Sequence, residues 1–287
     1  MPERIPRQPF EGCIATYAEA NVVIIGAGFD GTSSYRPGSR FAPQALRAEA
    51  LYSQENYSPY FQQDLTDFKI HDWGDLDLPF GEKHRALAAI QQQIRQLFTD
   101  GKKPAVIGGE HLISLPVIEE AQRIYPNLVV VQLDAHLDLM DELFGERLSH
   151  GTVMRRVVEV LGTGERLYQV AIRSGSREEF AFARKHTQLY PFTTREFLKH
   201  LPALKDTPIY LSVDLDVFDP SLIPGTGTPE AGGIFFPEFM EVLKALLSHQ
   251  VIALDMVELS PKIDPTGNST IHAAKIFREM LMMLAID

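Results

Sequence analysis

The sequence predicts an α/β fold in which a parallel β-sheet is covered by helices on both faces. Short apolar runs typical of buried strands alternate along the chain with segments of roughly 10–15 residues that have helical patterning. A hydrophobic content of 45% is sufficient for a large core in 287 residues. No linker, charge block, low-complexity tract or internal repeat divides the sequence, so we expect residues 1–287 to form one domain.

Each predicted strand is an apolar run, as expected for a parallel strand that is buried on both faces. In chain order, the strands are predicted at residues 21–26, 69–72, 105–107, 128–133, 167–172, 208–213 and 251–254. The helices are predicted at residues 42–53, 83–100, 113–125, 150–161, 177–185, 237–247 and 271–285. Gly101 and Pro126 follow two of these helices and are typical residues at which a helix stops.

Ionisable side chains follow the strand predicted at residues 128–133. Asp134, His136 and Asp138 come directly after it, and side chains two positions apart on a strand share a face. We therefore expect the three to project together from the carboxyl end of this strand. Such groups are costly to bury without a compensating charge, which a divalent metal ion supplies. A polar loop without metal is the alternative for this motif taken alone.

The same pattern follows three further strands. Asp214 and Asp216 again lie two positions apart, directly after the strand that ends at Val213. His111 follows two glycines that let the backbone turn, and Glu258 follows the last strand. Because ligands gather at the carboxyl ends of strands in open α/β sheets, we predict a metal site at this edge.

The candidate metal ligands are two imidazoles and four carboxylates, with no thiolate: His111, Asp134, His136, Asp138, Asp214 and Asp216. Closed structural zinc sites favour Cys and His, whereas oxygen-rich mixed sites suit manganese or a similar hard ion. Six ligands exceed the number that one tetrahedral ion uses. Two ions bridged by shared carboxylates would use all six and would activate a water molecule.

Charge and composition exclude several classes of function. The net charge of −11 disfavours a nucleic acid partner and suits a cationic substrate. No apolar run approaches the ~20 residues that a membrane span requires, and no signal peptide is evident. The single Cys13 excludes an intrachain disulfide, and we expect a cytoplasmic protein.

Residues 26–31 match the dinucleotide-binding fingerprint letter for letter and follow a predicted strand. That fingerprint requires a helix to begin at once, so that the helix amino terminus can hold a pyrophosphate. Pro37, Gly38 and Pro43 would break such a helix. We therefore predict a glycine-rich turn and no dinucleotide cofactor.

As an ordered set, these motifs resemble the ureohydrolase (arginase/agmatinase) family. The set comprises residues 108–111, 134–138, 212–220 and 257–258, and the resemblance extends from Ser34 through Thr270. Within the family it is greatest to bacterial agmatinases, notably at residues 57–60, 148–152 and 224–229. The resemblance implies a three-layer α/β/α sandwich, a dimanganese centre and hydrolysis of a guanidino group to an amine and urea. It also implies a homo-oligomer, commonly a trimer or hexamer.

The resemblance further implies how the ligands are shared between two manganese ions. By the family pattern, one ion takes His111, Asp134, Asp138 and Asp214, and the other takes Asp134, His136, Asp214 and Asp216. Asp134 and Asp214 would then bridge the two ions. The strand argument gathers the same side chains but does not assign them to individual ions.

The expected chemistry gives roles to further residues. Glu258 can hold the planar N–H fork of a guanidinium by two charge-assisted hydrogen bonds, unless it is an ion-pair partner of Arg173 or another cation. Asp138 is expected to relay a proton from the nucleophile to the leaving nitrogen. His150 is expected to shuttle protons or to bind the substrate, the alternative being a packing role near a helix amino terminus. Asp219 precedes a proline and is predicted to form a turn.

The prediction of the substrate depends on the loop at residues 139–149. It contains Asp141, Glu142 and Glu146 against Arg147, and lacks the Asn- and Ser-bearing segment with which arginases receive the α-carboxylate. Acids that line the site would repel a substrate carboxylate and favour a terminal ammonium. We therefore expect agmatine, cleaved to putrescine and urea in polyamine biosynthesis, with arginine and guanidinobutyrate as poorer substrates. A loop that faces solvent would carry no such information.

Two other classes of protein compete with this interpretation. An inactive binding protein of the same fold would be expected to have lost metal ligands, and none is missing from the sequence. A metal-dependent deacylase would use one zinc ion and fewer carboxylates. Leu137 and residues 265–270 depart from the family pattern, and residues 224–233 are predicted to form a wall of the site.

Overall fold

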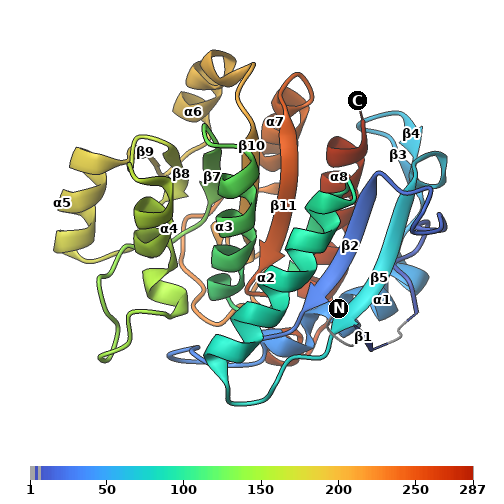
Figure 1. Ribbon diagram of the computed structural model, residues 1–287, viewed down its shortest axis with the longest axis horizontal. Coiled ribbons are helices and arrows are strands. Elements are labelled where there is room, and N and C mark those ends of the chain that lie inside the picture. Colours follow the sequence, from blue (N-terminus) through green and yellow to red (C-terminus); the bar gives the residue numbers. More distant parts are fainter. Residues whose placement is uncertain (1–3, 6–7, 287) are drawn as a thin grey trace.

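The computed structural model describes residues 4–5 and 8–286, which contain a central sheet of nine strands (Figure 1). The strands are β1 (Arg4–Ile5), β2 (Val22–Ala27), β5 (Ile70–Leu76), β6 (Lys103–Gly108), β7 (Val129–Leu133), β8 (Leu167–Ile172), β9 (Gln188–Pro191), β10 (Ile209–Asp214) and β11 (Val251–Val257). Their order in the sheet is β1-β5-β2-β6-β11-β10-β7-β8-β9. β1 is antiparallel to β5, and all other neighbours are parallel.

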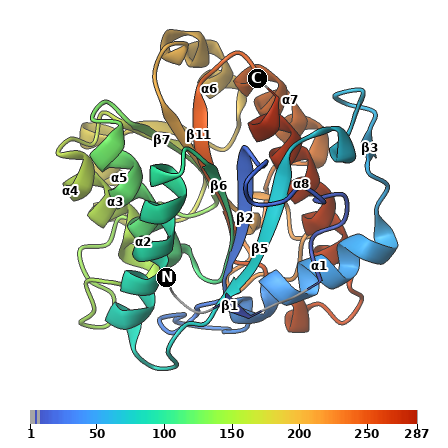
Figure 2. The same ribbon diagram turned by 45° about the vertical axis from the view of Figure 1, so that its right-hand side comes forward.

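Helices cover both faces of the sheet (Figure 2). One layer consists of α1 (Ala42–Ser53), α6 (Arg195–His200), α7 (Phe236–Leu246) and α8 (Asn268–Ala285). The other consists of α2 (Lys83–Thr99), α3 (Ser114–Ile124), α4 (Val153–Leu161) and α5 (Arg177–His186). The predicted three-layer α/β/α sandwich is confirmed. Among the described residues, no helix is long and apolar enough to cross a membrane.

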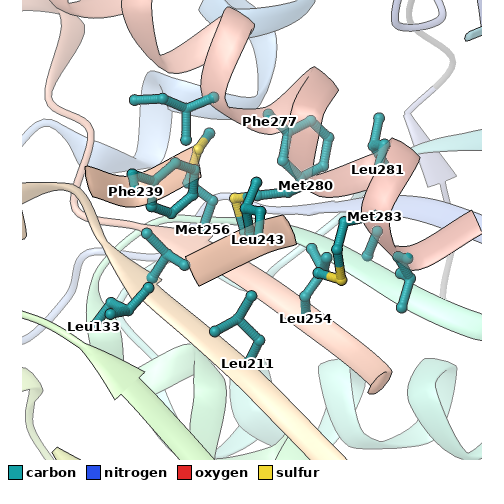
Figure 3. Packing of buried hydrophobic residues seen from close by; sticks show 14 of the residues in the cluster. Leu133, Leu211, Phe239, Leu243, Leu254, Met256, Phe277, Met280, Leu281 and Met283 are labelled. Carbon is teal, nitrogen blue, oxygen red and sulfur yellow. The ribbon is translucent and has the colours of Figure 1, made fainter. Parts of the chain in front are cut away.

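Alternate side chains of each strand pack against opposite layers, as the pleat of a strand requires. In β2, Val22 and Ile24 belong to the cluster under α1 and α8, whereas Val23 and Ile25 belong to the cluster under α2 and α3. Figure 3 shows part of the first cluster, where strand side chains face those of α7 and α8: Leu133, Leu211, Leu254, Met256, Phe239, Leu243, Phe277 and Met280. Burial of each such side chain stabilises the fold by roughly 1.5–3 kcal/mol.

Most element boundaries differ from the predicted ones by a few residues. The helix at residues 42–53 and the strand at residues 167–172 are confirmed without change. β11 continues beyond its predicted end to Val257, and α8 begins earlier, at Asn268. No strand is predicted from the sequence at β1 or β9, no helix at α6, and no hairpin of β3 (Tyr57–Ser58) and β4 (Gln63–Asp64). β9 lies at the sheet edge and is mostly half-buried, so it lacks a continuous apolar run.

No helix begins directly after residues 26–31, as predicted: Gly26 and Ala27 end β2, and the next helical segment is the 3-10 turn at Ser39–Phe41. Gly26 makes room for another side chain: a Cβ atom there would lie 2.0 Å from Oδ1 of Asp75. Asp75 pairs with Arg47, which is only 1% exposed and also donates to both carboxylate oxygens of Asp72, at 2.7 and 2.9 Å. The absence of a side chain at Gly26 therefore leaves space for a buried ion-pair network that connects α1 to β5.

Replacing Arg47 with Met should lower the free energy of unfolding by about 3–5 kcal/mol, because the buried carboxylate of Asp72 would lose the guanidinium that it bonds through both oxygens. Arg85→Met is the matched control, since Arg85 pairs with Glu82 at the surface and its side chain is 70% exposed. Exposed pairs contribute about 0–1 kcal/mol. Urea denaturation of both variants measures the difference, and equal losses would contradict a stabilising role of the buried pair.

Candidate metal centre

The side chains singled out in the sequence lie at the carboxyl ends of four central strands. β6, β11, β10 and β7 are neighbours in the sheet in this order. Asp214 is the last residue of β10, and His111, Asp134 and Glu258 follow the ends of β6, β7 and β11. Residues that are far apart in the sequence therefore meet at one edge of the sheet.

The two acidic motifs are turns and not continuations of their strands. β7 ends before Asp134, so the prediction that Asp134, His136 and Asp138 share a strand face is wrong. Instead, the backbone N–H of His136 donates to Oδ1 of Asp134 (2.6 Å), and the N–H of Asp216 donates to Oδ1 of Asp214 (2.9 Å). A carboxylate that bonds to the backbone two residues further on forms an Asx turn, which bends the chain over the sheet edge.

His111 lies at the centre of the cluster with its side chain fully buried. Its Nδ1 atom is 3.1 Å from an oxygen of Asp134, 3.1 Å from one of Asp138 and 3.3 Å from one of Asp214. Nδ1 nevertheless makes no hydrogen bond with the described residues. The buried nitrogen and the three carboxylates that it faces form a suitable set of ligand atoms for a cation. Because the nitrogen has no hydrogen bond to the described residues, this set fits a metal ion.

The other ring nitrogen of His111 is fixed by a buried polar chain. The Ser212 hydroxyl donates to Oδ1 of Asp255 (2.7 Å), and the Tyr210 hydroxyl donates to the other oxygen of Asp255. Because the Ser212 hydroxyl donates its only proton to Asp255, its oxygen can only accept, and it accepts from Nε2–H of His111 (2.9 Å). In the neutral imidazole, Nδ1 therefore carries the lone pair that faces the carboxylates. Partners of this kind orient metal-binding imidazoles.

Two groups of potential ligands share one carboxylate. The ligand atoms of His111, Asp134 and Asp138 lie within 4.8 Å of one another, as do those of Asp134, His136 and Asp216. Within the second group, Nδ1 of His136 is 2.9 Å from Oδ2 of Asp216. Asp134 belongs to both groups, which is the geometry of a bridging ligand.

The buried carboxylates repel one another electrostatically. Burial, together with Asp216 and Asp138, raises the pKa of Asp134 to about 7, and burial with Asp216 raises the pKa of Asp214 well above its usual value. Burial also acts to raise the pKa of Asp216, but His136 lowers it to about 2. Full ionisation of the four aspartates would place a charge of −4 here, which two divalent cations would neutralise.

Two residues of the site have a left-handed backbone, Asp138 with φ of 52° and Glu258 with φ of 66°. Such strain costs roughly 1–3 kcal/mol per residue and concentrates at functional sites. Oε1 of Glu258 accepts from the backbone N–H of His111 (2.8 Å), and burial raises the pKa of Glu258 well above its usual value. The alternative of an ion pair with Arg173 is not supported, because Arg173 donates to the backbone carbonyls of residues 171, 216–218, 230 and 231.

A cavity of about 310 Å³ opens beside the cluster. Five of its lining residues are acids: Asp138, Asp214, Asp216, Glu179 and Glu258. No Lys or Arg is among the described residues that line it. Three of these acids, Asp138, Asp214 and Asp216, are candidate metal ligands, so Glu179 and Glu258 are the two that would favour a cationic ligand.

The acidic loop contributes apolar side chains to this cavity, and the prediction that its acids face a substrate is wrong. Met140 and Leu143 line the cavity. Asp141 instead pairs with Arg156 (2.7 Å), and Glu146 pairs with Lys83, with more than half of each acidic side chain exposed. The charges of Asp141 and Glu146 are therefore balanced by neighbouring cations, and none of the three loop acids lines the cavity.

Glu179 is a cavity residue that the sequence did not single out. It is buried and accepts from the backbone N–H groups of Ser176 (2.8 Å) and Leu139 (3.0 Å). Ser176 and Glu179 form a capping box at the start of α5. The capping box is visible in the sequence, but it predicts only a helix start.

His150 lies half-buried in the cavity wall, in the 3-10 turn (His150–Thr152) that precedes α4. Its Nε2 atom accepts from the backbone N–H of Ser34 (3.2 Å) and lies 2.9 Å from the Ser34 hydroxyl oxygen. The Thr32 hydroxyl oxygen accepts from the backbone N–H of His150 (3.1 Å). Burial lowers the pKa of His150. Sequence reasoning assigned no site role to Thr32 or Ser34.

The remaining expectations concern the loops around the site. Asp219 forms a turn as predicted, since it accepts from Ser221 and from the backbone N–H groups of residues 232 and 233. Thr228, in the predicted wall at residues 224–233, lines the cavity. Leu137 is fully buried in the core cluster under α2 and α3, and it also lines the cavity. Residues 265–270 do not line the cavity, so their departure from the family pattern leaves its wall unchanged.

The model of the Arginase family matches residues 20–283. The chain belongs to the arginase family. An agmatinase of Bacillus anthracis is 42% identical over 271 residues, which are 93% of each chain. A guanidinobutyrase of Pseudomonas aeruginosa is 31% identical over 92% of this chain and 86% of its own. The crystal structure of the agmatine ureohydrolase of Thermoplasma volcanium is similar with a TM-score of 0.86 at 29% identity, covering 98% of this chain and 95% of that one.

Adding Mn²⁺ to the metal-free protein should raise its melting temperature, because an ion bound only by the folded state adds about 2.7 kcal/mol at 100 times its Kd. Asp134→Asn should abolish most of this gain, since Asp134 belongs to both ligand groups. Asp141→Asn, in the exposed loop, should respond as the unmodified protein does. Thermal unfolding with elemental analysis measures both effects, and an unmodified protein that gains no stability would contradict a metal site.

Proposed function

We propose that the chain is a dimanganese hydrolase that cleaves agmatine to putrescine and urea, a reaction of polyamine biosynthesis. The observation that carries this proposal is the acidic cavity, which lacks Lys and Arg among its described residues and adjoins the cluster of metal ligands. The agmatinase and agmatine ureohydrolase relatives support the same activity.

Two manganese ions would be held by six side chains of the cluster. We assign one ion to His111, Asp134, Asp138 and Asp214, and the other to Asp134, His136, Asp214 and Asp216. The two groups of nearby ligand atoms, which share Asp134, support this division. Oxygen-rich sites with imidazole suit manganese. When bound, the ions would supply an activated water molecule for attack on the guanidinium carbon.

The cavity has a carboxylate on each side of the cluster for the two ends of agmatine. Glu258 follows β11, whereas Glu179 lies on α5, which follows β8; β10 and β7 lie between these strands in the sheet. Glu258 would bind the guanidinium N–H groups by charge-assisted hydrogen bonds. Glu179 would attract the terminal ammonium. The proposal of agmatine as the substrate therefore depends on Glu258 and Glu179, and no longer on the acidic loop.

Hydrolysis adds water across the bond between the guanidinium carbon and the alkyl-bearing nitrogen. The water oxygen bonds to the carbon, the carbon–nitrogen bond breaks, and the leaving nitrogen gains a proton because an amide anion is a poor leaving group. Asp138 would take a proton from the water and pass it to that nitrogen. His150, in the cavity wall, would exchange protons there or steady the substrate.

Guanidinobutyrate and arginine hydrolysis are the competing activities, and the Pseudomonas aeruginosa relative is a guanidinobutyrase. Each of these substrates carries a carboxylate, which would face the acidic cavity. A like-charge contact at about 4 Å costs roughly 1–4 kcal/mol, or about tenfold to several hundredfold in selectivity. An inactive binding protein is disfavoured because the six metal-ligand residues and His150 are all present.

The family resemblance further supports a homo-oligomer, either a trimer or a hexamer, as the assembled form. We retain the cytoplasm as the proposed location. The partner proposed from the net charge is a small cationic guanidino compound, with no nucleic acid or membrane partner.

The manganese-loaded protein should have a kcat/KM for agmatine at least about tenfold above its values for arginine and guanidinobutyrate, because only agmatine lacks a carboxylate. Urea release from the three compounds at equal protein concentration measures this. Preference for either carboxylate-bearing compound would refute agmatine as the substrate.

Asp138→Asn should lower kcat by roughly 10²–10⁴-fold, because an amide cannot relay the proton. His150→Ala should lose a comparable factor if the imidazole exchanges protons. Glu142→Gln is the control, since Glu142 is exposed and does not line the cavity. Steady-state urea release with measured manganese content separates lost chemistry from lost metal. A His150→Ala variant with an unchanged kcat would reassign His150 to structure.

A further inference from the structure

Residues 32–34, in the loop after β2, hold His150 at both its backbone and its ring. The Thr32 hydroxyl oxygen accepts from the His150 N–H, and both the N–H and the hydroxyl of Ser34 lie within hydrogen-bond distance of Nε2. β2 and α4 belong to different parts of the fold, so this contact joins two segments 116–118 positions apart. The proposed function gives these contacts no role.

The contact with Ser34 determines where the imidazole carries its proton. A backbone N–H can only donate a hydrogen bond, so its partner Nε2 must offer a lone pair. A neutral imidazole has one bare nitrogen and one N–H. With Nε2 bare, the proton of the neutral ring resides on Nδ1. The Ser34 hydroxyl, at 2.9 Å, can donate to the same lone pair.

The contact with Thr32 fixes the start of the 3-10 turn that carries His150. The Thr32 hydroxyl donates its single proton to Oε1 of Glu110, which leaves its oxygen free to accept from the His150 N–H. Oε2 of Glu110 also accepts from the backbone N–H of Thr32 (2.7 Å) and from Ser33 Oγ at 3.4 Å. Glu110 is fully buried and immediately precedes His111. The hydrogen bonds from Glu110 through Thr32 therefore link the position of His150 to that of the candidate metal ligands.

We propose that Ser34 holds His150 in the tautomer with its proton on Nδ1, and that Thr32 and Glu110 are positioning residues that fix the turn carrying His150. The neutral ring then has Nδ1–H as its one donor, and the two Ser34 groups occupy the lone pair of Nε2. This assignment deepens the proposed function, on which it rests, by naming the atoms through which His150 acts. It also gives Ser34, where the family resemblance begins, a role in the site.

Neutron crystallography of the manganese-loaded, deuterium-exchanged protein reads the tautomer directly. We expect deuterium on Nδ1 of His150 and none on Nε2, with the Ser34 backbone deuteron directed at Nε2. Deuterium on Nε2 of a neutral ring would overturn the proposal. This measurement needs no substrate, so it is independent of whether agmatine is hydrolysed.

Kinetics of paired variants test the positioning role. Thr32→Val keeps the shape of the side chain but removes the hydroxyl, and we expect kcat for agmatine to fall about tenfold or more while KM changes less than about threefold. Thr32→Ser restores the hydroxyl and should recover kcat to within about threefold. Thr66→Val is the control, because the exposed Thr66 hydroxyl also donates to a carboxylate, that of Asp64 (2.6 Å).

Manganese content and melting temperature decide how a loss arises. Thr32→Val should keep the manganese content of the unmodified protein, because Thr32 does not belong to either ligand group. Loss of manganese together with kcat, or failure of Thr32→Ser to recover kcat, would overturn the positioning role. If the protein hydrolyses none of the guanidino compounds, the proposed function fails, while the deuterium positions on His150 still decide the tautomer.

Discussion

Repulsion among four buried aspartates is the constraint on which the rest of the structure depends. Asp134, Asp138, Asp214 and Asp216 converge around two imidazoles, and burial makes their shared negative charge unfavourable. Divalent cations relieve this repulsion. Each acid must therefore be held where a cation can bind it. The left-handed backbone of Asp138 is a strained conformation that accompanies the placement of its carboxylate in the cluster.

The parallel sheet meets this requirement through its strand order. β6, β11, β10 and β7 are neighbours, so their carboxyl ends bring together four segments from different parts of the sequence. Two Asx turns then aim the aspartates, and the chain from His111 through Ser212 to Asp255 leaves Nδ1 bare toward them. Asp255 lies within β11, so a strand side chain of the core also orients a ligand of the site.

The acidic loop at residues 139–149 shows where sequence reasoning was wrong. A surface acid can be satisfied equally by solvent, by a cation or by a substrate, and the sequence does not distinguish these outcomes. Asp141 forms an ion pair with Arg156 and Glu146 forms one with Lys83, so neither acid faces the cavity. The carboxylate that does line the cavity, Glu179, is part of a capping box and was therefore inconspicuous. Both conclusions favour a cationic substrate, but only the second follows from residues in contact with the cavity.

The sequence by itself determined the sandwich and the family, and it singled out the candidate metal ligands, because apolar strands that end in His, Asp and Glu form a local pattern. Only the tertiary structure decided how these side chains are held, which acids face the cavity and which atom of His150 is bare. Those features depend on contacts between distant segments, such as Ser34 with His150 and Glu258 with His111. The physical reason is that a strand pattern fixes the face and end of an element, whereas hydrogen-bond partners are chosen only when the elements pack.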